Sequence, residues 1–178
     1  MHVFWAHGYE GASLAALTDA MGINKPSMYS AFGSKEELFL KAVQKYLSGP
    51  ASFVADCMKE PTARQVAMKL LTEAAEFLTC HEHPQGCMVI QGALSCGEGA
   101  AHIQKALMEK RSGYETALAT RFEKFRIAGG LPADADVAAL ARYVATLHQG
   151  MSVQATSGAS REELMAVVRI AMSQWPGP

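Results

Sequence analysis

The apolar side chains of this chain recur at helical spacing along its length. Leu14, Leu17 and Met21 are three and four residues apart, and longer stripes of the same kind follow. No segment alternates apolar and polar residues as a half-buried strand does. The fold is therefore predicted to be all-α, with helices near residues 14–21, 25–32, 35–47, 62–80, 87–95, 101–127, 137–151 and 161–175.

A tight turn and a short helix are predicted after the first of these segments. Gly22 tolerates the positive φ that a helix C-terminus needs, and Asn24 can cap the next helix. Pro26 suits a first helical turn, where its missing N–H has no partner. Gly33 ends the short helix, and a Ser-x-x-Glu capping box at residues 34–37 begins another.

The short helix has one small, polar face. Its apolar side consists only of Met28, Tyr29 and Phe32. A face without bulky apolar groups can approach another surface closely, so it suits a groove. The residues that form this face are Lys25, Ser27, Ser30 and Ala31.

Several motifs in residues 4–43 are familiar as a set. They are Gly8-Tyr9-Glu10-Gly11, Ser13-Leu14, Met21-Gly22-Ile23, Met28-Tyr29 and Phe32-Gly33-Ser34-Lys35-Glu36-Glu37-Leu38. Together they resemble the N-terminal helix-turn-helix domain of TetR-family transcriptional regulators. Residues 85–94 and 131–164 look like the other half of one branch of that family. The resemblance implies a DNA-binding domain at 1–47 and a helical ligand-binding and dimerisation domain at 48–178.

One departure from the family pattern concerns the first helix. Family members usually carry a full first helix behind a short basic arm, whereas residues 1–4 match a position near the end of that helix. We therefore expect Leu17 and Met28 to have less cover and DNA affinity to be lower. A dimerisation module with impaired DNA binding is one alternative that follows.

Base and phosphate contacts are expected on the short helix, because the second helix of a helix-turn-helix lies in the major groove. Lys25 can donate to guanine, Ser27 and Ser30 can bond bases or phosphates, and Pro26 can pack on a thymine methyl. The resemblance implies phosphate contacts for Ser13, Tyr29 and Lys35, whereas Asn24 caps the helix. The alternative is a set of solvated polar residues. The full candidate set is Ser13, Asn24, Lys25, Pro26, Ser27, Tyr29, Ser30 and Lys35.

Composition fits a single polypeptide of ordinary globular class. The chain has 178 residues, 49% of them hydrophobic, and a formal net charge of −1, which argues against a non-specific nucleic-acid coat. No apolar run is long enough to span a membrane and no signal peptide leads the chain, so a cytoplasmic location is expected. No catalytic motif occurs, so we expect neither an enzyme nor a cofactor.

Flexible apolar and aromatic side chains in the second half favour a ligand pocket between helices. Such residues at helical spacing more often form ordinary core, and that alternative stays open. Two polar residues on apolar stripes are candidates for orienting a small-molecule inducer. The ligand candidates are Met68, Phe77, Met88, Gln91, Tyr114, Phe122, His148 and Met151.

A cluster of thiols and imidazoles offers a different function. Cys80, His81, His83 and Cys87 lie close together in sequence, and clustered thiols in a cytosolic protein suggest redox sensing or metal binding. The spacing does not match a Cys-x-x-Cys site, so no metal is expected. A metal- or redox-sensing protein remains the alternative function.

The last two helices are expected to form the contact between two copies of the chain. Both carry broad apolar stripes and are joined by residues 157–160, so they should form a hairpin with one side left uncovered. A two-fold partner would cover it as a four-helix bundle, and a homodimer would meet a palindromic operator. The residues named for the interface are Val144, Leu164, Val168, Met172 and Trp175.

Overall fold

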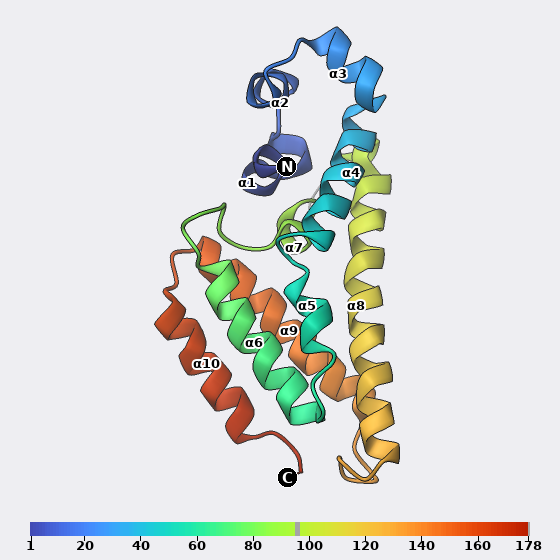
Figure 1. Cartoon of the computed structure of the whole chain (residues 1–178), viewed down its shortest axis with the longest axis vertical. Coiled ribbons are helices and arrows are strands. Elements are labelled where there is room, and N and C mark those ends of the chain that lie inside the picture. Colours follow the sequence, from blue (N-terminus) through green and yellow to red (C-terminus); the bar gives the residue numbers. More distant parts are fainter. Residues whose placement is uncertain (95–96, 178) are drawn as a thin grey trace.

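The computed structural model describes residues 1–94 and 97–177, with Glu98 described by its main chain only. This part of the chain contains helices, turns and loops and no strand, as predicted (Figure 1). The elements are α1 (His2–Gly11), α2 (Leu14–Met21), α3 (Lys25–Phe32), α4 (Lys35–Ser48), α5 (Phe53–Cys57), α6 (Ala63–Leu78), α7 (Met88–Gln91), the 3₁₀ turn η1 (Glu98–Ala100), α8 (Ala101–Ile127), α9 (Val137–Thr156) and α10 (Arg161–Ser173).

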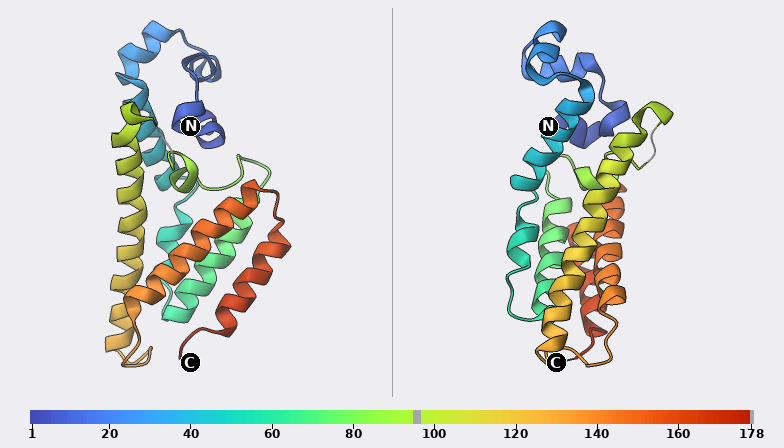
Figure 2. Two further views of the ribbon diagram at one scale, coloured as in Figure 1. Left: turned by 180° about the vertical axis from the view of Figure 1, so that it is seen from behind. Right: turned by 90° about the vertical axis from the view of Figure 1, so that its right-hand side faces the viewer.

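The helices are arranged in two regions that share α4 and α7. Helices α1, α2 and α3 lie at one end of the molecule, and α4 runs from that end towards a bundle of α5, α6, α8, α9 and α10 (Figures 1 and 2). Helix α8 spans most of the long axis, and α6 packs between α9 and α10. The short α7 contacts α1, α4, α8 and α9, so it lies where the two regions meet.

Two predicted elements differ from the observed ones. Helix α5 was not predicted, because the stretch before Glu60 carries no clear apolar stripe. The helix expected at residues 87–95 is reduced to the four residues of α7, and Ser95 lies outside the described residues. Gly92 sits where the turn of α7 closes, with its N–H on the carbonyl of Met88 at 2.8 Å.

Local capping explains why the longer helices begin where they do. Ser34 and Ser160 each form both hydrogen bonds of a capping box, as their sequences predicted. Thr62 accepts from the backbone N–H of Gln65 at 3.2 Å, but its hydroxyl donates to the Gln65 side chain at 2.8 Å. That box is therefore half formed, with a side-chain pair in place of the second backbone bond.

The core continues from the bundle into the first helices. Phe4, Trp5 and Phe39 are buried, and Phe4 packs edge-on against Phe39 with ring centroids 5.0 Å apart. Leu17 and Met28 retain 3% and 0% of their exposure. The expectation that these two side chains lack cover is therefore wrong.

No helix in the described part of the chain combines the length and the apolar character needed to cross a bilayer. The division of the chain at residues 47 and 48 falls at the end of α4. Because Tyr46 and Leu47 of that helix also face the bundle, the division into two domains stays a prediction.

Candidate functional site

Helix α3 is presented by the local signals in its flanking turns. Gly22 has a φ of 65° and donates its N–H to the carbonyls of Thr18 and Asp19, which ends α2. The Asn24 side chain accepts from the N–H of Ser27 at 2.8 Å and so caps α3. These hydrogen bonds fix the turn between α2 and α3 with backbone and capping groups alone.

The outer face of α3 is open to solvent. Met28 is fully buried beneath the helix, whereas Tyr29 is 45% exposed. The other exposed candidates lie on the same short helix, so they present a polar surface to a partner: Lys25, Pro26, Ser27 and Ser30.

Three candidates around α3 have further contacts. The Lys35 ammonium lies 4.6 Å from the ring centroid of Tyr9 in α1, a cation–π contact that orients it. Ser13 accepts from the N–H of Ala16 at 3.1 Å and caps α2. The side-chain oxygens of Ser13 and Asn24 accept the capping hydrogen bonds. The Ser13 hydroxyl hydrogen and the Asn24 NH₂ group therefore remain to donate to a phosphate or a base.

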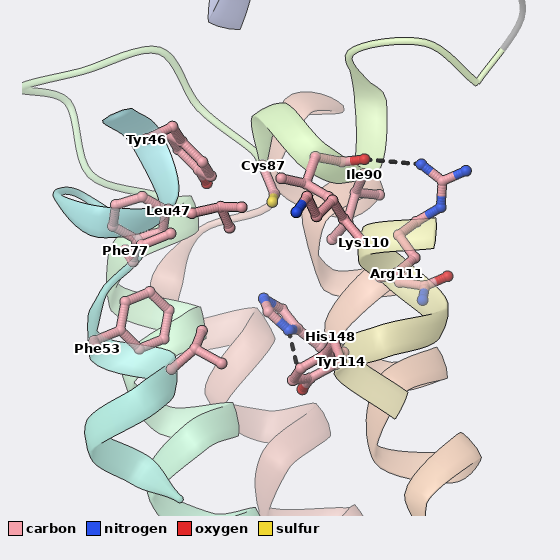
Figure 3. A pocket seen from close by; sticks show the side chains of 14 residues that line it. Tyr46, Leu47, Phe53, Phe77, Cys87, Ile90, Lys110, Arg111, Tyr114 and His148 are labelled. Carbon is pink, nitrogen blue, oxygen red and sulfur yellow. Dashed lines mark hydrogen bonds between the residues drawn. The ribbon is translucent and has the colours of Figure 1, made fainter. Parts of the chain in front are cut away.

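An interior cavity of about 140 Å³ lies where α4 to α9 converge (Figure 3). Phe77, Tyr114 and His148 line it, so three of the eight predicted ligand residues meet there. The prediction missed the rest of the wall: Tyr46, Leu47, Ala51, Phe53, Val54, Cys87, Val89, Ile90, Lys110, Arg111 and Gln149.

The other five predicted ligand residues are placed elsewhere. Met68 is 38% exposed, outside the cavity wall. Met88, Phe122 and Met151 are core side chains, and Phe122 packs edge-on against Trp175. Gln91 donates to the Thr156 hydroxyl at 2.8 Å, so it ties α7 to α9. For these residues the ordinary structural explanation holds.

Two polar side chains face each other at the floor of the cavity. His148 Nδ1 lies 3.3 Å from the Tyr114 hydroxyl. Burial lowers the pKa of His148 to about 4 and raises that of Tyr114, so both side chains are neutral at pH 7.

A second polar group is buried near the top of the cavity. Tyr46 is 0% exposed, and its hydroxyl has no hydrogen-bonding partner of regular geometry among the described residues. It lies beside the Cys87 thiol, and burial raises the pKa of both groups. A buried hydroxyl without a hydrogen bond of regular geometry is unusual in a protein interior.

Main-chain bonds join the cavity wall to the first helix. The Tyr9 N–H donates to the Gly92 carbonyl at 2.8 Å, directly after α7. Gly8 has a φ of 67°, and a Cβ at that position would lie 3.1 Å from the same carbonyl oxygen. Trp5 Nε1 donates to the Gly86 carbonyl at 3.0 Å. We call this set of contacts, from Trp5 to Gly92, the α1–α7 joint.

The cysteine and histidine cluster does not converge on one point. His83 stacks on Trp5 with ring centroids 4.4 Å apart, whereas Cys87 faces the cavity. His81 is exposed and Cys80 is half-buried. Among the described residues, no group of three or more His, Cys, Asp or Glu side chains could hold a metal ion.

The residues predicted for the dimer interface are already buried within the single chain. Their exposures range from 0% for Val144 to 8% for Trp175, so they have little surface to offer a partner. That assignment is corrected: these side chains pack inside the single chain, and Trp175 packs edge-on against Phe122 of α8. The other three are Leu164, Val168 and Met172.

A short helix that is capped between two turns and stands above a helical bundle is the arrangement of helix-turn-helix regulators. Residues 1–42 match the family of bacterial regulatory proteins called tetR. Over nearly their whole length, two transcriptional repressors of Escherichia coli K12 are similar. ComR is 30% identical over 99% of this chain and 85% of its own, and BdcR is 31% identical over 95% and 81%.

A solved structure extends the likeness to the whole fold. A cysteine mutant of the TetR-family regulator CifR, bound to 26-base-pair operator DNA, is 41% identical with a TM-score of 0.95. The match covers 98% of this chain and 92% of that one. The chain therefore belongs to the TetR family and is a helix-turn-helix transcriptional regulator.

Proposed function

We propose that the chain is a repressor that binds a palindromic operator as a homodimer and leaves it when a small molecule fills the cavity. The observation that carries this proposal is the likeness to CifR, which is 41% identical and is held on operator DNA. Because the target of such a regulator is the chromosome, we place the protein in the cytoplasm. Its action is binding, and we assign it no catalytic step.

On the DNA side, α3 would enter the major groove. Lys25 stands at its N-terminus, the end that meets base edges in a helix-turn-helix, with Pro26 and Ser27 beside it. Tyr29 and Lys35 would contact the phosphate backbone. The 45% exposure of Tyr29 and the contact of the half-buried Lys35 with the Tyr9 ring support these roles.

The homodimer would form through exposed apolar side chains that lie beside the buried ones named from the sequence. On α9, Tyr143 and Val153 are 41% and 45% exposed, and on α10 Val167 and Ile170 are 38% and 69% exposed. Helices α9 and α10 contact each other, and both pack on α6. An apolar surface shared by two helices suits a four-helix bundle with a second copy.

On the ligand side, the cavity touches the elements that hold the DNA-binding helices. Tyr46 and Leu47 belong to α4, whose first turn follows the recognition helix, and Ile90 belongs to α7. An occupant would press on these walls and, through the α1–α7 joint, on α1. Ligand binding and operator binding would then bias the same arrangement of helices.

The proposal is tested by selecting operators from a pool of random duplexes with the purified full chain. We expect the recovered sequences to share two inverted half-sites about 34–36 Å apart, bound by two chains in sedimentation. Recovery of no preferred sequence, or a complex with one chain per duplex, would refute the proposed function.

A further inference from the structure

The polar part of the cavity wall has an uneven charge. Lys110 and Arg111, adjacent on α8, both line the cavity, whereas none of the described lining residues is acidic. Neither cation has an ion-pair partner among the described residues. His148 does not add to this charge, because its lowered pKa keeps it neutral. The wall is therefore cationic.

Arg111 is held in place but is not neutralised. One of its N–H groups donates to the Val89 carbonyl at 2.8 Å, and the side chain is partly buried. Burial lowers its pKa, so the charged form is poorly solvated where it stands. A partly buried guanidinium without a carboxylate is stabilised by an anion that reaches it.

The Tyr46 hydroxyl, which makes no hydrogen bond of regular geometry and lies beside the Cys87 thiol, belongs to the same cavity. A hydroxyl in this position can donate to a ligand acceptor. A cationic wall and a hydroxyl donor beside it together favour a ligand that carries an anionic oxygen.

The remaining part of the cavity wall is apolar, and the cavity is small. Phe53 and Phe77 lie 5.3 Å apart between ring centroids, on the side of the cavity opposite Lys110 and Arg111 (Figure 3). The volume of about 140 Å³ is close to that of a protein cavity, about 150 Å³, that is known to bind benzene. A single six-membered ring with a small substituent fits this space.

We propose that the cavity binds a small aromatic carboxylate, with its ring against Phe53 and Phe77 and its carboxylate directed to Lys110, Arg111 and Tyr46. This inference rests on the proposed function, because it names the class of inducer for the same cavity. It requires no covalent step. The carboxylate supplies the charge that the described wall lacks.

The test compares two probes of nearly equal size on the full chain by calorimetry. Benzoate carries the charge, and benzyl alcohol carries the same ring without it. A charge-assisted hydrogen bond in a partly buried site contributes enough that benzoate should bind roughly tenfold more tightly or better. Equal affinity for the two probes, or tighter binding of benzyl alcohol, would overturn the proposal.

Two variants locate the carboxylate. Lys110→Met should weaken benzoate roughly tenfold and leave benzyl alcohol unchanged, and Tyr46→Phe should weaken benzoate without changing the shape of the ring site. Lys105→Met is the matched control, because Lys105 is an exposed lysine of the same helix outside the cavity. An equal loss in Lys105→Met and Lys110→Met would indicate general surface charge and overturn the assignment.

A gel shift on the selected operator distinguishes a failure of this ligand proposal from a failure of the proposed repressor function. Suppose that the protein binds the operator, that benzoate does not weaken this binding, and that calorimetry detects no binding of benzoate. This result would refute only the aromatic carboxylate as the class of ligand. Failure to bind any operator removes the proposed regulator function, while calorimetry still decides what the cavity takes.

Discussion

The two functional regions of this chain satisfy their polar groups in opposite ways. Around α3, polar side chains bond backbone groups three residues away, as Asn24 does with Ser27, and the rest face solvent. In the cavity, Tyr46, Tyr114 and His148 come from three helices that are distant in sequence, and one of them has no regular partner within the described residues. A surface built locally can bind without rearranging, whereas an interior with an unmet polar group gains from an occupant.

The largest expected effect concerns the surface that joins two copies. The double variant Val167→Glu with Ile170→Glu should remain folded, because both side chains are exposed, but should sediment as a monomer. Loss of the second half-site should reduce operator affinity by about 100-fold or more. Ile127→Glu, on the neighbouring helix α8 and 74% exposed, is the control and should stay dimeric.

Val168→Glu tests whether the buried neighbour of Val167 belongs to the core of the single chain, since Val168 is only 1% exposed. It should lower the melting temperature of the chain, because it places a carboxylate in the core. A dimeric double variant would show that the interface lies elsewhere, and a fully stable Val168→Glu would contradict the burial of Val168 within its own chain.

The recognition surface should separate into two kinds of contact. Lys25→Ala should cost about 1–3 kcal/mol on the operator and relax sequence preference at one position. Lys35→Ala should weaken all duplexes alike and reduce the salt slope by roughly one. Fluorescence anisotropy on operator and random DNA at several salt concentrations measures both, and equal losses on both DNAs for both variants would contradict the assignment.

The cavity floor should make stability depend on pH. The pKa of His148 falls from 6.5 to about 4 in the folded chain, so between these values the unfolded chain binds the proton more readily. The free energy of unfolding should therefore decrease as pH falls, by roughly 1.5 kcal/mol from pH 6.5 to 5. Urea unfolding of His148→Leu should lack this part of the slope, and exposed His81→Gln should retain it.

The α1–α7 joint should show a smaller effect. Gly8→Ala combines a left-handed residue with a Cβ 3.1 Å from the Gly92 oxygen, whereas Gly129→Ala, at a φ of 81°, meets nothing within 4 Å. Both should lose about 1–2 kcal/mol of stability from the backbone alone. Only Gly8→Ala should also weaken operator binding, by about fivefold in a gel shift; equal operator affinity in the two variants would make the joint purely structural.

The cysteines should show the smallest effect. Burial raises the pKa of Cys87, and burial together with Glu73 raises that of Cys57 to about 12, so both thiols stay protonated at neutral pH and are poor nucleophiles. Cys80→Ser and Cys87→Ser should leave operator binding and release unchanged. Stoichiometric zinc on the wild type that is lost in the double variant would restore the metal-sensing alternative.

A feature of this chain was predictable from the sequence when the residues that form it lie close together along the chain. The caps at Ser34 and Ser160 were predictable because both partners lie within four residues. The cavity was predicted only in part, because its wall combines residues from 46 to 149 and periodicity does not indicate which stripes meet.

The dimer assignment failed for a related reason. An apolar stripe identifies the side of a helix that is buried, but not what buries it. Val168 packs inside its own chain, while its neighbour Val167 faces outward. One signal could have directed attention to the cavity, the adjacent cations Lys110 and Arg111 on a helix that lines it.

The hydrogen bond from Tyr9 to Gly92 uses only main-chain atoms. Such a bond does not depend on the side chains of the two segments, except at Gly8, where a Cβ would meet the Gly92 oxygen. The side chains of α7 that face the cavity could therefore be exchanged for others without rebuilding the connection to α1. Under the proposed function, a chain organised in this way could change its ligand and its operator by separate substitutions, while the same main-chain hydrogen bond keeps α1 and α7 joined.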